Sequence, residues 1–126
     1  MTDLEMTMLC AKAMKIVCTV SYDRYSNMAF AEIIDPANPG NGGAYGPLHD
    51  DAQCMALEDY LIERGYLHYE DGEHMFYTWP LETSKFIFSA DFKDKAGRRR
   101  AIVACVAQME AAKLDADERK KNDAPR

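Results

Sequence analysis

The chain has 126 residues, 48% of them apolar and 29% charged, which is the size and composition of one globular domain. Its 15 basic and 21 acidic residues give a formal net charge of -6, which excludes a general nucleic-acid binder, because such proteins depend on a basic surface. The sequence has no run of about 18 apolar residues and no basic-then-apolar leader. We therefore expect no membrane contact and no secretory signal.

The first predicted element is an amphipathic helix over about 3–17. Thr2 and Glu5 have the spacing of a capping box at its start. Apolar residues then recur at intervals of three and four, as one buried helical face requires. They are Met6, Leu9, Cys10, Ala13, Met14 and Val17.

Two strands and a long loop are predicted next. The segments 18–22 and 28–34 are β-branched and aromatic, with a polar turn between them, and Asp35-Pro36 closes the second. The stretch 36–47 then carries three of the five prolines and four of the seven glycines. This composition predicts an irregular loop, and its glycines are not in register for a dinucleotide or phosphate-binding motif.

A second helix is predicted from Pro47 to a stop at Gly65. Asp50 or Asp51 can cap its start, and both suit the positive end of the helix dipole. The expected inward-facing residues are Cys54, Leu57, Tyr60, Leu61 and Arg64.

A hairpin, one more strand and a final helix complete the predicted elements. Asp71-Gly72 separates two aromatic-rich runs, which is a strong hairpin signal, and 85–90 is a further strand. The last helix is expected from near Asp94 to about Leu114, with a buried stripe of Ile102, Val103, Val106 and Met109. The segment 115–126 holds four acids and four bases, so we expect a frayed or disordered tail.

The element order predicts the fold class. Helices interleaved with adjacent antiparallel strands are typical of an α+β domain, with a small antiparallel sheet packed by three helices as an α/β sandwich. We expect one domain over 1–114, followed by the charged tail. The four cysteines lie far apart without a CxxC pair, which is typical of free thiols in a reducing cytoplasm.

The sequence offers no catalytic arrangement. No paired carboxylates, Ser/His/Asp or Cys/His set can be argued from spacing, so we expect neither an enzyme nor a cofactor. His68 and His74 flank the predicted hairpin turn, and His49 precedes a helix. A metal site needs three or four converging ligands, so exposed polar and capping roles are favoured over a metal-dependent hydrolase, which stays as an alternative.

Three consecutive arginines, Arg98 to Arg100, are the most informative feature of the chain. They fall in the first turns of the last helix, where cations oppose the helix dipole. Helix amides and guanidinium groups together commonly hold an anion. The alternative is a solvated face, with the arginines neutralised by Asp91 and Asp94.

Over roughly 45–112 the chain resembles the phage ABA-sandwich family, small bacteriophage or prophage proteins related to NinX-type accessory proteins. The resemblance rests on the segment Tyr45-Gly-Pro-Leu-His-Asp-Asp-Ala52, on the aromatic hairpin, and on a closing Ala90-Asp-Phe and Arg99-Arg-Ala-Ile-Val-Ala-Cys-Val106. The Pro/Gly loop and the arginine triplet are departures from it. The resemblance implies a cytoplasmic protein of the infected bacterial cell that binds without catalysis.

Proteins of similar architecture counter host defence by sequestering nucleotide signals, such as the cyclic ADP-ribose-type messenger of Thoeris immunity. Carried over, this implies phosphate contacts from Arg99 and Arg98 and stacking by Phe92 or Tyr45. The aromatic face of the hairpin suggests a homo-oligomer. An alternative partner is a host nuclease or DNA-binding protein, inhibited by an acidic surface. That surface comprises Asp50, Asp51, Glu58, Asp59, Glu63, Glu70, Asp71 and Glu73.

Overall fold

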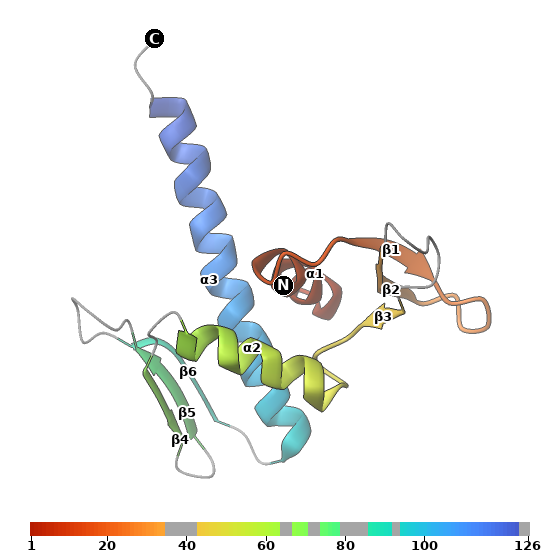
Figure 1. Cartoon of the computed structure of the whole chain (residues 1–126), viewed down its shortest axis with the longest axis horizontal. Helices are drawn as coiled ribbons and strands as arrows, with labels where there is room; N and C mark the ends of the chain where they lie inside the picture. The colour runs from red at the N-terminus through yellow and green to blue at the C-terminus, as the bar shows by residue number, and fades with distance from the viewer. Residues whose placement is uncertain (35–42, 64–66, 71–73, 79–85, 92–93, 124–126) are drawn as a thin grey trace.

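The computed structural model describes residues 1–34, 43–63, 67–70, 74–78, 86–91 and 94–123 (Figure 1). The elements in chain order are α1 (Asp3–Ala13), β1 (Cys18–Tyr22), β2 (Ala29–Ile33), β3 (Ala44–Tyr45), α2 (Asp51–Glu63), β4 (Leu67–Glu70), β5 (His74–Thr78), β6 (Phe86–Asp91) and α3 (Lys95–Asp123). The predicted α+β class, a small antiparallel sheet with three helices, is confirmed.

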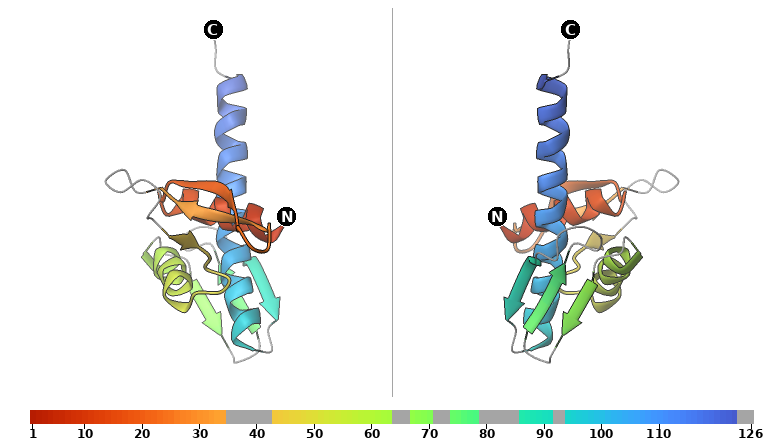
Figure 2. Two further views of the ribbon diagram at one scale, coloured as in Figure 1. Left: turned by 90° about the vertical axis from the view of Figure 1, so that its right-hand side faces the viewer. Right: turned by 90° about the vertical axis from the view of Figure 1, so that its left-hand side faces the viewer.

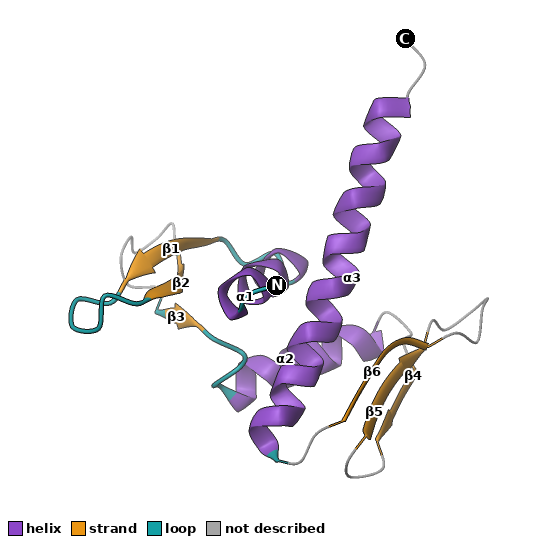
Figure 3. Cartoon of the chain, turned by 180° about the vertical axis from the view of Figure 1, so that it is seen from behind, coloured by secondary structure: helices purple, strands orange, loops and turns teal. Residues whose placement is uncertain are grey.

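The strands form two separate three-stranded antiparallel sheets. One has the order β1-β2-β3 and the other the order β4-β5-β6. They lie on opposite sides of the helices (Figures 1 and 3). The sequence did not predict β3, because two residues at the end of a Pro/Gly-rich stretch carry no readable alternation.

Helix α3 is the central element of the molecule. It packs against α1 and α2 and touches the second sheet at β5 and β6. Its C-terminal part projects beyond every other element (Figure 2). The fully buried side chains come mainly from α2 and the first half of α3, as their spacing predicted: Leu57, Leu61, Ile102, Val103 and Val106.

The N-terminal helix starts as predicted and ends earlier. The Thr2 hydroxyl accepts a hydrogen bond from the Glu5 amide at 3.1 Å, which confirms the cap. The helix ends at Ala13, because Lys15 takes a left-handed conformation (φ 59°) and the chain turns toward β1. The prediction of a helix to residue 17 is therefore wrong, and Val17 is 63% exposed rather than buried.

The start of α2 also matches its predicted cap. The Asp50 carboxylate accepts a hydrogen bond from the Gln53 amide at 2.9 Å, and the helix begins one residue later. Cys54, Leu57 and Leu61 are buried as predicted, and Tyr60 is half-buried. Arg64, Gly65 and the Asp71-Gly72 turn lie outside the described residues, although β4 and β5 do pair as an antiparallel hairpin.

The last helix is longer than predicted. It continues from Leu114 to Asp123, so the expectation of a disordered tail from residue 115 is wrong over that stretch. The residues after Leu114 are mostly good helix formers, and Arg119 pairs with Asp115 one turn earlier at 3.2 Å. Among the described residues, no helix is long and apolar enough to cross a bilayer.

Candidate functional site

The three consecutive arginines at the start of α3 contact three different parts of the chain. Arg98 extends to α2, where one Nη lies 3.0 Å from the Glu58 Oε2 and 3.3 Å from its Oε1. The Glu58 side chain is 14% exposed, so this ion pair is partly shielded from water. Because removal of one partner would leave the other charge partly buried, this contact is costlier to break than a surface pair.

Arg99 contacts the turn before α2 and the first residue of that helix. Its Nε donates to the Leu48 carbonyl at 2.9 Å, and its Nη1 lies 2.7 Å from the Asp51 carboxylate. The guanidinium is largely covered, whereas the Asp51 side chain is 73% exposed. This ion pair therefore has one mobile, solvated partner.

Arg100 reaches in the opposite direction, to the start of α1. Two of its nitrogens bind the two oxygens of Asp3 at 2.8 and 3.0 Å. This hydrogen bonding lowers the pKa of the Asp3 carboxyl, although both side chains are more than half exposed. The triplet thus joins the starts of all three helices. Asp94, one of the expected local neutralisers, caps α3 by accepting from the Gly97 amide at 2.8 Å.

Two of the arginines line a small groove between the starts of α2 and α3. Its volume is about 260 Å³. We call it the arginine groove, and its lining residues are Asp51, Cys54, Met55, Lys95, Arg98 and Arg99. Three cations and one carboxylate line it, and Glu58 pairs with Arg98, so the groove keeps a small excess of positive charge on a chain of net charge -6. Burial raises the pKa of the Cys54 thiol to about 11, so that thiol is neutral.

A larger and more acidic cleft lies on the other side of the α2 start. It has a volume of about 490 Å³ and is bounded by the first half of α1, by β2 and β3, and by the turn before α2. Tyr45 forms part of its wall and is 4% exposed. Burial raises the pKa of the Tyr45 hydroxyl well above its ordinary range. Asp3, His49 and Asp50 also line this cleft, which makes it unsuited to phosphate.

The four predicted ligand-binding residues are therefore not all brought together. Arg98 and Arg99 share the arginine groove, whereas Tyr45 belongs to the core and the separate cleft. Phe92 lies outside the described residues. Lys95 was not predicted as a site residue, although its position three residues before Arg98 and four before Arg99 places it on their helix face.

The metal alternative gains no support in the part of the chain that the structure describes. No group of three potential ligands occurs among those residues. In the hairpin register His68 is opposite Tyr77, and His74 is opposite Asp91 on β6. The two histidines are therefore not cross-strand neighbours.

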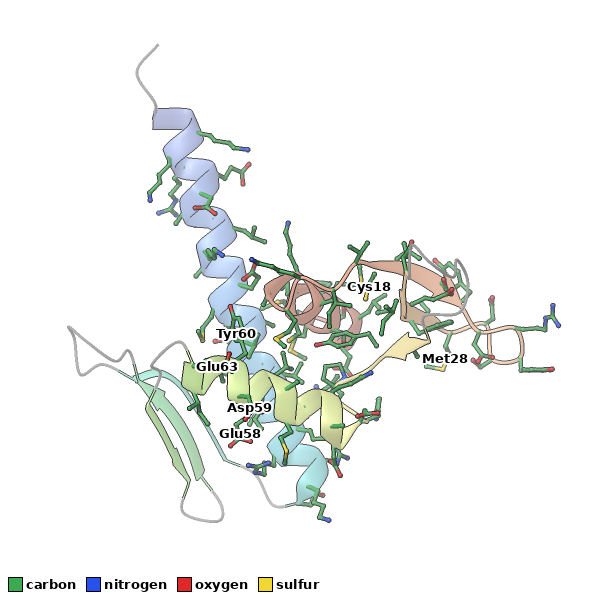
Figure 4. The ribbon with its side chains drawn as sticks, viewed as in Figure 1. Cys18, Met28, Glu58, Asp59, Tyr60 and Glu63 are labelled. Atoms are coloured by element: carbon green, nitrogen blue, oxygen red, sulfur yellow. The ribbon has the colours of Figure 1, made fainter. Side chains whose placement is uncertain are left out.

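The arginines of α3 contact two of the acidic residues that were predicted to form a surface on α2. Glu58 and Asp51 face arginines of α3, as described above. Asp59 and Glu63 are exposed on the same helix (Figure 4). An inhibitor surface would therefore have fewer free carboxylates than the sequence suggests.

Comparison of the chain with protein-family models, with curated proteins and with solved structures found no match. The resemblance to the phage ABA-sandwich family thus stays a prediction, and the functional argument rests on the site itself.

Proposed function

We propose that the chain is a binding protein without catalytic activity and that the arginine groove holds a nucleotide-type anion. The observation that carries this proposal is the convergence of Lys95, Arg98 and Arg99 on one groove. Guanidinium groups recognise phosphate through paired hydrogen bonds, and the ammonium group of lysine adds a point charge.

One of the two existing ion pairs leaves room for a ligand, whereas Arg98 stays bound to Glu58 and contributes its charge. The Asp51–Arg99 pair has an exposed carboxylate, and such pairs contribute at most about 1 kcal/mol. A phosphate can displace the Asp51 side chain into water and take its place at the Arg99 Nη1. Lys95 is exposed, and no described residue forms an ion pair with it.

The apolar part of the groove supports a nucleotide rather than bare phosphate. Met55 lines the groove and is 61% exposed, which leaves its thioether free to contact a flat ring. Sequestration of a nucleotide signal in an infected cell, the role that the phage resemblance implies, requires a site of this chemistry. We include that role in the proposal.

Calorimetric titration with ADP and with pyrophosphate at low salt tests the site. Lys95→Ala should weaken binding about fivefold, which corresponds to loss of a contact of about 1 kcal/mol. Asp51→Asn should strengthen binding by a similar factor, because it removes the competing carboxylate without shortening the side chain. A gain of affinity is informative, since a damaged fold would not produce it.

Each variant has a matched control on the same helix. Lys113→Ala makes the same charge change on α3 away from the groove, and Asp59→Asn does so on α2. Neither should alter affinity beyond a small general charge effect. Absence of binding by both anions, or equal effects of the Lys95 and Lys113 variants, would contradict the proposal.

A further inference from the structure

The outer edge of the first sheet is open, in the sense that no described strand pairs with it. β1 lies at the end of the order β1-β2-β3, and its sequence Cys-Thr-Val-Ser-Tyr contains no charge and no proline. Its pairing with β2 is regular from Cys18 to Tyr22. Proteins usually protect such edges with charged residues, proline, bulges or very short strands. The opposite edge, β3, is protected in this way, because it has two residues.

The hydrogen-bond pattern shows which backbone groups the open edge presents. The Ile34 amide donates to the Val17 carbonyl and the Asp23 amide to the Met28 carbonyl, both at 2.9 Å. In an antiparallel ladder every second residue bonds to the same neighbour. Thr19 and Ser21 therefore point their backbone groups toward β2. Those of Cys18, Val20 and Tyr22 point outward.

The side chains along this edge are apolar and accessible. Val20 is 42% exposed and Tyr22 67%, and both lie on the face that carries Cys18. Cys18 lies beside α1. Met28, which is also exposed, lies at the far end of the hairpin (Figure 4). An accessible backbone edge flanked by apolar side chains is a template for another strand.

We propose that a second copy of this chain pairs with β1 in the antiparallel direction, about a two-fold axis at Val20. The two sheets then become one six-stranded sheet. Val20 faces Val20 of the second copy, and Cys18 faces Tyr22 of the second copy. Each outward residue both donates and accepts a hydrogen bond in this register.

Charge and self-complementarity favour a second copy over an unrelated strand. Lys15 precedes β1, and Asp23 and Arg24 follow it, so antiparallel pairing brings Asp23 of one copy to the end where Lys15 of the other lies. Two backbone amides, of Tyr25 and Ser26, donate to the Asp23 carboxylate and keep it ionised. The strand itself is uncharged, so pairing of two copies puts no like charges directly opposite each other.

Disulfide trapping tests the register directly. Hydrogen-bonded antiparallel pairs have Cα atoms about 5.5 Å apart, within the range that a disulfide spans. Tyr22→Cys should therefore cross-link to the native Cys18 of a second copy under mild oxidation. The same two positions within one chain are about 13 Å apart along the strand and cannot be bridged. Peptide mapping should recover the 18–22 linkage from a covalent dimer.

Two controls and one independent measurement complete the test. Ser21→Cys, on the other sheet face, and Tyr22→Cys with Cys18→Ser should both stay without this linkage. Sedimentation of the unmodified chain should show a dimer that Val20→Lys converts to a monomer, while Thr19→Lys does not. A monomeric unmodified chain, or cross-linking of Ser21→Cys as fast as Tyr22→Cys, would overturn the proposal, and capture of an unrelated strand by a monomer would replace it.

Discussion

The three-helix centre and the outer β1–β2 hairpin use their apolar residues in opposite ways. In the centre, Leu57, Leu61, Ile102 and Val103 are all buried to 0% exposure. In the hairpin, Val20, Tyr22, Tyr25 and Met28 are exposed. The centre buries these four side chains within one chain, whereas the hairpin leaves its four exposed, and no described strand pairs with the outer edge of β1. The difference separates the part of the molecule that carries most of the packing from the strand edge that we propose to pair with a second copy.

The largest expected effect is truncation of a central side chain. Leu61→Ala removes a side chain with 0% exposure and should lower the free energy of unfolding by about 2–5 kcal/mol, because it leaves a cavity. Ile62→Ala, at the next position of α2 and 55% exposed, should change it by no more than about 0.5 kcal/mol. Urea denaturation measures both, and equal losses would show that the centre is not packed as described.

The reaction rates of the four native cysteines measure the same contrast in burial, and no mutation is needed. Cys10, Cys54 and Cys105 are buried in the centre, and Cys18 is partly exposed in the hairpin. Under native conditions Cys18 should react with a thiol reagent about a hundredfold faster than the other three, which must wait for local opening. Peptide mapping after timed alkylation identifies the order. Early labelling of Cys10 would contradict the account.

The buried thiols also determine how the free energy of unfolding changes at alkaline pH. Burial raises the pKa of Cys10 and of Cys105 to about 12, so the folded state keeps protons that the unfolded state loses above about pH 8.5. Protons are then released on unfolding, and the free energy of unfolding falls as pH rises. Cys105→Ala should flatten this decline between about pH 8.5 and 12, as thermal unfolding at several pH values would show.

Loss of an arginine ion pair should cost less free energy of unfolding the more exposed the pair is. Arg98→Ala leaves Glu58 partly buried without this partner and should cost about 1–3 kcal/mol of unfolding free energy. Arg100→Ala breaks a pair exposed on both sides and should cost less than about 1 kcal/mol. It should also return the lowered pKa of Asp3 toward its ordinary value, which a carboxyl NMR titration detects. A larger cost for Arg100→Ala would reverse the ranking.

The smallest expected effect lies at the end of α3. Residues 115–121 are exposed, and one described ion pair supports them. Removal of 115–126 should change the free energy of unfolding by less than about 0.5 kcal/mol and leave the central packing intact. A large loss in a chemical denaturation experiment would show that this segment packs on something.

Local signals in the sequence predicted much of the fold. The caps at Thr2 and Asp50 and the buried stripe through Ile102, Val103 and Val106 depend on neighbours within four residues, and all are confirmed. The helix end at Ala13 was missed because a left-handed residue at Lys15 leaves no mark in the apolar spacing. The division of the strands into two sheets depends on pairing between distant segments, which periodicity does not encode.

The contacts of the candidate site also depend on segments that are distant in the sequence. The arginine cluster was visible in the sequence, but its partners were not, because Arg100 and Asp3 are 97 positions apart. Tyr45 was predicted as a stacking residue, as an implication of the phage resemblance. Its burial follows from pairing with Ala31 on β2, which only the tertiary structure defines.

The most direct test of the proposed site is NMR observation of the arginine Nε–H groups during titration with ADP. Arg98 and Arg99 line the arginine groove, and Arg100, the next residue in sequence, binds Asp3 outside it. The account predicts saturable shifts of the Arg98 and Arg99 signals and no saturable shift of the Arg100 signal. Equal, non-saturating shifts of all three, or no shift at all, would contradict it.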